Sequence, residues 1–180
     1  MERLGGGVLT RLRGDQRGVS AVEFAMLAPV LIAMYFGLAE FCQGFMAQKR
    51  LGHTTSMVAD LVAQRDAITG GQIDDVFMVG SLIMQPFSSA SLKLRVSQVT
   101  RGTDGVARVD WSRSGGLTAR TAASTVTVPT GMIANGETVI MSEATYDYDS
   151  PVDYMMPSIT NFSQTFYLRP RSVEKITYTP

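Results

Sequence analysis

Residues 24–39, FAMLAPVLIAMYFGLA, form an uncharged apolar run that constrains this chain more than any other feature. The apolar character continues to Phe45 and Met46, with Glu23 and Glu40 near the two ends. A helix rises about 1.5 Å per residue, so roughly 20 residues cross a bilayer. We therefore expect a membrane-spanning helix over residues 19–48. A buried core helix or a cleaved signal peptide is the alternative, but the run is long for a signal peptide and QGFMAQKRLGH, which follows it, is a poor cleavage site.

The charges around this run predict the orientation of the chain. Residues 1–18 contain four arginines and two acidic residues, and such a basic leader favours a cytoplasmic N-terminus. Lys49 and Arg50 on the far side weaken this bias. Residues 49–180 are then expected to form a domain outside the cytoplasm. Over the whole chain, 16 basic residues balance 16 acidic ones, which argues against nucleic-acid binding because that function requires a basic surface.

Glu23 lies inside the apolar segment, where an ionisable side chain is costly unless it is paired or near the interface. One explanation is that Glu23 reaches the headgroup boundary or pairs with Arg17. The other uses its spacing from Gly18, because cleavage after Gly18 would make Val19 the first residue and Glu23 the fifth. The new amino group of one subunit would then pair with Glu23 of another, and the pair would set the axial offset between their helices.

The segment RGVSAVEFAMLAPVLIAMYFGLAEF resembles the N-terminal signature of the TadE-like proteins of tight-adherence (Tad/Flp) pilus systems. In that signature a Gly, four further residues and Glu-Phe or Glu-Tyr precede a hydrophobic helix. The resemblance covers residues 16–45 and rests on Gly18, Glu23, Phe24, Pro29 and the later pair Glu40-Phe41. Weaker similarities to longer members of the family are found at Asp60-Leu61-Val62, Met84-Gln85-Pro86, Trp111-Ser112, Tyr146-Asp147-Tyr148 and residues 167–171.

This resemblance implies a pseudopilin or minor pilin of a type IV pilus in the bacterial inner membrane, with a periplasmic C-terminal domain. Its implied partners are membrane lipid, the major and other minor pilins, a membrane aspartic prepilin peptidase and the inner-membrane assembly platform. The residues implied in processing are Gly18, Val19, Glu23 and Phe24. Cleavage there would remove the leader and leave a mature chain with a formal charge of −2, because 12 basic and 14 acidic residues remain.

Small side chains along the same segment predict close packing between helices. Ala25 and Ala28, and then Ala33 and Gly37, recur at three- and four-residue spacings that allow helices in lipid to approach closely. Alanine and glycine are also common in membrane helices generally, which is the alternative interpretation. Pro29 removes one main-chain hydrogen bond and is expected to kink or loosen the helix.

After residue 50 the periodicity predicts an α+β, pilin-like domain with short helices followed by an antiparallel sheet. Met57, Val58, Leu61 and Val62 indicate that helix continues or soon resumes, and Gly70-Gly71 is expected to end it. A second helix of about 14 residues is expected from Ile73 to Pro86, with Asp74 and Asp75 in its first turn. The expected strands are residues 92–97 and 107–111, joined as a hairpin by a turn at 102–105, then 125–128, 139–148 after an Asn135-Gly136 turn, and 162–169.

Catalytic and metal-binding patterns are weak in this sequence. His53 is the single histidine and lacks metal ligands at suitable spacing, so we expect a surface or interfacial residue. Cys42 is the single cysteine and is expected to fill space in the membrane helix. Asp147, Asp149 and Asp153, interleaved with tyrosines, match no EF-hand spacing; calcium there is a minor alternative to a solvated loop or a partner-binding surface.

We therefore expect a non-enzymatic, structural pilin-like subunit that needs no cofactor and packs through its N-terminal helix. An uncleaved single-pass scaffold of the pilus assembly machinery is the principal alternative. A membrane-anchored hydrolase is a more distant one, because a lone histidine beside the bilayer offers little for a catalytic triad.

Overall fold

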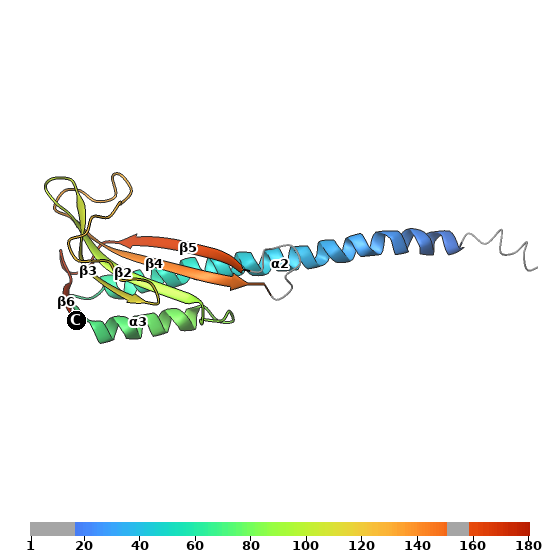
Figure 1. Ribbon diagram of the computed structural model, residues 1–180, viewed down its shortest axis with the longest axis horizontal. Helices are drawn as coiled ribbons and strands as arrows, with labels where there is room; N and C mark the ends of the chain where they lie inside the picture. Colours follow the sequence, from blue (N-terminus) through green and yellow to red (C-terminus); the bar gives the residue numbers. More distant parts are fainter. Residues whose placement is uncertain (1–16, 151–158) are drawn as a thin grey trace, which may run out of the picture.

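The computed structural model describes residues 17–150 and 159–180, and within them the chain forms two helices and six strands (Figure 1). Helix α2 (Arg17–Ala63) is followed by strand β1 (Ala67–Thr69) and helix α3 (Gly70–Ile83). The remaining strands are β2 (Leu92–Arg101), β3 (Ala107–Gly115), β4 (Thr138–Asp149), β5 (Ile159–Leu168) and β6 (Thr177–Thr179). This order of a long apolar helix, a short helix and an antiparallel sheet confirms the predicted α+β class.

Helix α2 is continuous from the apolar run into the domain, and Pro29 lies within it. The first half projects away from the rest of the molecule, whereas the second half lies along the sheet (Figure 1). Leu51, Val58 and Val62 are completely buried in this second half, at a spacing that places them on one helix face. The amphipathic stretch expected after residue 50 is therefore a direct extension of the apolar helix.

Helix α3 begins three residues earlier than its hydrophobic stripe suggests. Thr69 is its N-cap and forms a capping box with Gln72, each side chain accepting from the other residue's backbone N–H. Gly70 and Gly71 therefore start this helix and do not act as the break after α2, which ends at Ala63. As a result Asp74 lies in the second turn and not in the first, where we had expected it. The stripe itself is confirmed, and its buried members are Ile73, Val76, Phe77 and Gly80.

The larger sheet has the order β3-β2-β4-β5, with antiparallel neighbours throughout. The β2–β3 hairpin and the strand after Asn135-Gly136 are confirmed, and Gly136 adopts a φ of +87° that favours glycine in this turn. Side chains of β2 and β4 that face α2 join one core with both helices. Its members include Leu51, Val58, Ile73, Phe77, Leu94, Val96, Ile140 and Ala144.

One strand prediction was wrong, and one strand was not predicted. Residues 125–128 form no strand, because only Thr125 makes an isolated bridge, to Arg108. The chain also continues past β5 to β6, which pairs in parallel with β1 in a second, small sheet. Trp111 anchors this end of the domain by stacking on Tyr178 with ring centroids 4.9 Å apart, and its Nε1 donates to the carbonyl of Ile176 at 3.4 Å.

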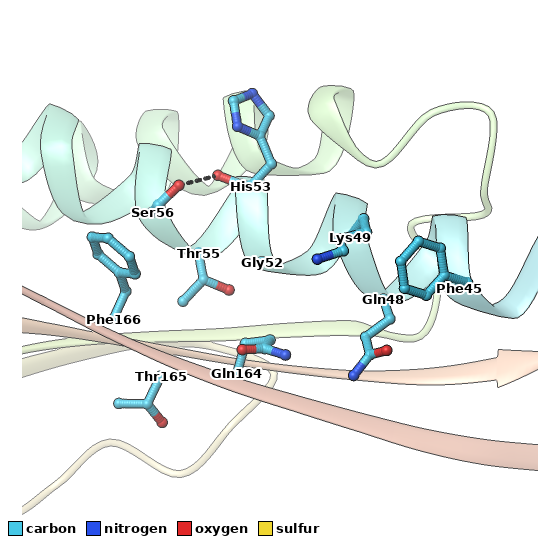
Figure 2. A pocket seen from close by; sticks show the side chains of 10 residues that line it. All are labelled: Phe45, Gln48, Lys49, Gly52, His53, Thr55, Ser56, Gln164, Thr165 and Phe166. Atoms are coloured by element: carbon cyan, nitrogen blue, oxygen red, sulfur yellow. Dashed lines mark hydrogen bonds between the residues drawn. The ribbon is translucent and has the colours of Figure 1, made fainter.

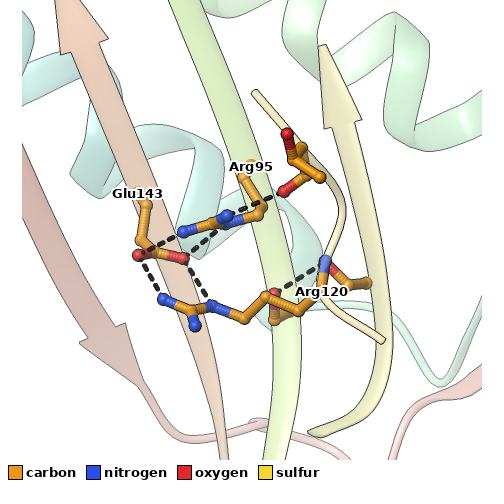
Figure 3. Close-up of polar contacts among 6 residues, drawn as sticks. Arg95, Arg120 and Glu143 are labelled. Carbon is orange, nitrogen blue, oxygen red and sulfur yellow. Dashed lines mark hydrogen bonds and ion pairs between the residues drawn. The ribbon is translucent and has the colours of Figure 1, made fainter. Parts of the chain in front are cut away.

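Residues 117–127 cross the sheet as an irregular strap that two arginines attach to Glu143 (Figure 3). Arg95 of β2 and Arg120 of the strap both donate to this carboxylate, at closest distances of 2.7 and 2.8 Å. Arg95 also donates to the carbonyl of Thr118, and Ser112 Oγ accepts from the backbone of Arg120. Burial alone would raise the pKa of Glu143, but the two arginines hold this pKa below its usual value.

Candidate functional site

The first half of α2, residues 18–39, has large apolar side chains that the rest of the described chain leaves uncovered. Met26 is 74% exposed, Phe24 66% and Leu27 60%, and the other large apolar residues of this half resemble them. Within the residues that the structure describes, α2 is the one helix long and apolar enough to cross a membrane. Within the part of the chain that the structure describes, this surface is left open for lipid or other protein chains to cover.

The residues predicted to take part in processing lie at the tip of this projecting half. Gly18 follows directly on the first described helical residue, and a Cβ atom placed on it would meet nothing within 4 Å. Val19, Glu23 and Phe24 are all exposed. Glu23 is the one charged residue between positions 18 and 39 of the sequence. The geometry thus gives a partner molecule access to both the Gly18–Val19 bond and the Glu23 carboxylate.

The residues predicted to pack between helices all lie on α2 but do not form a single stripe. At 100° per residue, Ala25 and Ala28 lie on a face about a third of a turn away from Ala33 and Gly37. Ala33 and Gly37 are in line with Gly44 and Ala47, which are buried further along the helix. One small-residue face therefore continues the surface that packs on the sheet, and the other points elsewhere.

Glu40 marks the point at which the domain begins to cover α2. This residue is 1% exposed, although its neighbours Leu38 and Phe41 are about 60% exposed. Its charge acts on Tyr148 at the end of β4, whose pKa is raised chiefly by burial and further by Glu40, while a hydrogen bond with Ser150 opposes the rise. The second acidic residue of the apolar segment is therefore buried by the chain itself, whereas the first one, Glu23, is not.

His53 lies on the exposed side of α2, as predicted for a surface histidine. A groove of about 460 Å³ runs between this part of α2 and β5, and Figure 2 shows His53 on the opposite side of the helix from Gln164 and Thr165. The Ser56 hydroxyl donates to the backbone carbonyl of His53 at 2.9 Å. His53 is therefore an accessible side chain on the half of α2 that packs against the domain.

The acidic cluster near the end of β4 is engaged in structural contacts. Asp147 accepts from Asn161 at 2.5 Å and from Lys93 at 3.2 Å, and these hydrogen bonds lower its pKa. Asp149 is exposed, and Asp153 lies outside the described residues. In residues 17–150 and 159–180, no group of three or more metal-ligating side chains comes together. The calcium interpretation thus gains no support from the residues that are described.

A comparison with known families gives one match, and it falls on this helix. Residues 18–60 match the family model described as TadE-like protein. Among curated proteins and among solved structures, nothing matches. The matched segment begins at Gly18 and ends within the last turn of α2, so it contains every predicted processing and packing residue. Over most of helix α2 the chain is therefore similar to the TadE-like family, which is associated with Tad pili.

Proposed function

We propose that this chain is a pilin-like subunit, a pseudopilin or minor pilin, of a Tad-type pilus. The observation that carries the proposal is that residues 18–39 project from the domain with their apolar side chains exposed, in the segment that matches the TadE-like model. Such a helix can be covered first by lipid and later by the helices of other pilins. The role is structural, and the domain behind the helix would initiate, cap or otherwise control the fibre.

The proposed arrangement is a single pass through the inner membrane. Residues 1–18 form a cytoplasmic leader, residues 19–48 span the bilayer, and residues 49–180 form the periplasmic domain. Because α2 continues to Ala63 without interruption, the periplasmic domain is built directly on the end of the spanning helix. The orientation of the domain in the membrane would then follow rigidly from the orientation of that helix.

Maturation would consist of hydrolysis of the Gly18–Val19 peptide bond by a prepilin peptidase. Water adds across the bond, giving the Gly18 carboxylate of the leader and a Val19 amino group that is protonated at neutral pH. That ammonium would pair with Glu23 of a neighbouring subunit and thereby neutralise both charges within the apolar bundle. The two small-residue faces, Ala25 with Ala28 and Ala33 with Gly37, would allow neighbouring helices to approach from two directions.

The test is incorporation of a Glu23→Ala variant into pili. Membrane insertion should be retained or improved, because the substitution removes a charge from the apolar segment. The amount of the chain in sheared pili should fall at least tenfold, since the ionic contact between helices is lost. Glu174→Ala is the matched control, because it removes an exposed carboxylate at the far end of the domain and should not change incorporation.

Normal incorporation of Glu23→Ala would contradict the proposed role of Glu23. A wild-type chain that stays with the membrane fraction, absent from sheared pili by immunogold labelling, would favour the assembly scaffold over the pilin. A hydrolytic activity abolished by His53→Ala would overturn the structural role altogether.

A further inference from the structure

A cationic pocket lies on α2 just beyond its apolar half. The cavity is about 420 Å³ and is lined by three basic side chains of α2, Lys49, Arg50 and His53. All three are exposed. Its walls are apolar and come from α2 and from the turn after α3, namely Phe45, Met46, Pro86 and Phe87. Among the described residues that line this pocket none is acidic, so the site is complementary to an anion that carries an apolar portion.

The two long cationic side chains are positioned by specific contacts. The Lys49 ammonium lies 5.2 Å from the centroid of the Phe45 ring, so this side chain is folded back by one turn toward the apolar half of the helix. Arg50 Nη1 donates to the carbonyl of Ile83 at 3.3 Å, at the C-terminus of α3. This bond orients a guanidinium that has five N–H donors in all. The two cations are therefore presented at one side of α2.

The near rim of this pocket, at Phe45, lies at the height of the headgroup layer of a bilayer. If the hydrocarbon begins at Val19, about 30 Å of helix brings its far boundary to the region of Ala39 and Glu40. The headgroup layer adds about 5–7 Å, or four to five residues, and so reaches Phe45. The folded-back Lys49 ammonium lies over that ring. Phe45 and Met46, each about half exposed, continue the apolar surface of residues 18–39 up to the cations.

We propose that this pocket binds the headgroup of an anionic phospholipid in the periplasmic leaflet. The phosphate oxygens accept hydrogen bonds from Lys49 and Arg50, and the glycerol and upper acyl chains lie against Phe45 and Met46. A carboxylate from a neighbouring protein would satisfy the cations but not the apolar wall that leads down to the bilayer. The lipid would fix the depth of the unassembled subunit. The proposal rests on the membrane insertion that forms part of the proposed function.

His53 provides a site-specific probe because it is the single histidine of the chain. The full-length chain, carrying a histidine-free tag, is reconstituted in nanodiscs of phosphatidylcholine with increasing fractions of phosphatidylglycerol. The imidazole NMR signal is followed at a constant pH of 8.5, about two units above the pKa of a free histidine side chain. We expect a saturable shift of the signal with phosphatidylglycerol, and no shift with glycerol phosphate added in solution to phosphatidylcholine discs.

Two charge-matched variants identify the residues responsible. Lys49→Gln should raise the phosphatidylglycerol fraction at half-maximal shift about fivefold, the effect of losing one cation near an anionic membrane surface. Lys175→Gln removes the same charge from an exposed side chain at the far end of the domain and should leave the titration unchanged.

An unchanged titration in Lys49→Gln would overturn the lipid site, as would an equal response to dissolved glycerol phosphate, which would indicate a site for free anions. A His53 signal that moves only when other pilins are added would assign the pocket to a protein partner. Failure of the chain to enter nanodiscs would reject membrane insertion itself. Insertion without dependence on phosphatidylglycerol would reject the lipid site alone and leave the pilin proposal standing.

Discussion

The two halves of helix α2 are part of one continuous helix but have opposite surroundings. In residues 18–39 large apolar side chains such as Leu27 and Met34 are about 60% exposed, whereas in the second half Leu51 and Val58 are fully buried. The second half packs against β4, β5 and α3, which the same chain supplies. The first half has no such cover among the described residues, and this is the half in which Glu23 lies.

This contrast separates the folding of the domain from the assembly of the protein. Burial of the second half stabilises the domain, because each apolar side chain removed from water there contributes about 1.5–3 kcal/mol. Burial of the first half requires lipid or another chain, and so it depends on location and partners and not on the fold. Substitutions in the two halves should therefore affect different measurements.

A pair of matched leucine substitutions tests the difference between the two halves of α2 most directly. Leu51→Ala should destabilise the domain by about 2–5 kcal/mol, because it leaves a cavity where the side chain is fully buried. Leu27→Ala should change that stability by less than about 0.5 kcal/mol. Chemical unfolding of the full chain in detergent, followed by the fluorescence of the single tryptophan Trp111, measures both values. Equal losses in the two variants would mean that the first half also belongs to the folded core.

A second pair of variants tests how closely α2 and α3 approach each other. A Cβ atom on Gly80 would lie 3.1 Å from side-chain atoms of Val58 and Leu94, whereas one on Gly71 would meet nothing within 4 Å. Gly80→Leu should therefore cost about 1–3 kcal/mol through overpacking. Gly71→Leu, in the same helix, should remain within about 0.5 kcal/mol of the wild type. If Gly80→Leu were tolerated equally well, the second half of α2 would be less tightly covered than the structure indicates.

The smallest expected effect on stability is that of replacing Glu143, which lies in the sheet that covers the second half of α2. The pKa of Glu143 in the folded protein lies below its value of about 4.3 in the unfolded chain. The stabilisation that its carboxylate provides is therefore fully present above the unfolded-state pKa and is lost as the pH falls through the folded-state pKa. Glu143→Gln should cost about 1 kcal/mol at pH 7. The difference from wild type should then shrink as the pH falls below about 4. A constant difference down to pH 2 would show that the ion pairs do not contribute.

The same pH titration should affect the two halves of α2 differently. Acid should weaken the sheet and the strap, since Arg95 and Arg120 lose their charged partner. The helicity of residues 18–39 in detergent should persist, because that half does not depend on the sheet. Far-ultraviolet circular dichroism, recorded beside the Trp111 signal, separates the two responses.

Much of this fold could be predicted from local pattern alone. The apolar run is identified by its length, whereas the stripe from Ile73 to Gly80 and the alternating hairpin residues each have a period that identifies the element. The short parallel pair β1–β6 was missed, because its register depends on contacts between residues more than 100 positions apart. The start of α3 was misplaced because Gly70 and Gly71 suggested a break, while the capping box of Thr69 and Gln72 fixes the true beginning.

The candidate site likewise contains some residues that the sequence could predict and others that it could not. Gly18 and Glu23 could be found from their spacing in the sequence, and the family match begins at the first of them. The division of the small residues into two faces follows from helical geometry and was equally accessible. The burial of Glu40 and the pocket at Lys49 could not be predicted, because both depend on how the sheet and the end of α3 pack beside α2.

The most direct test of the whole account is the intact mass of this chain recovered from sheared pili. If the chain is cleaved after Gly18 and residues 19–39 pack among other helices, the filament should contain a chain that begins at Val19 and lacks residues 1–18. Glu23→Ala should leave the same mature mass in the membrane fraction while the filament is depleted of the chain. A filament-associated chain that still carries residues 1–18 would contradict the account.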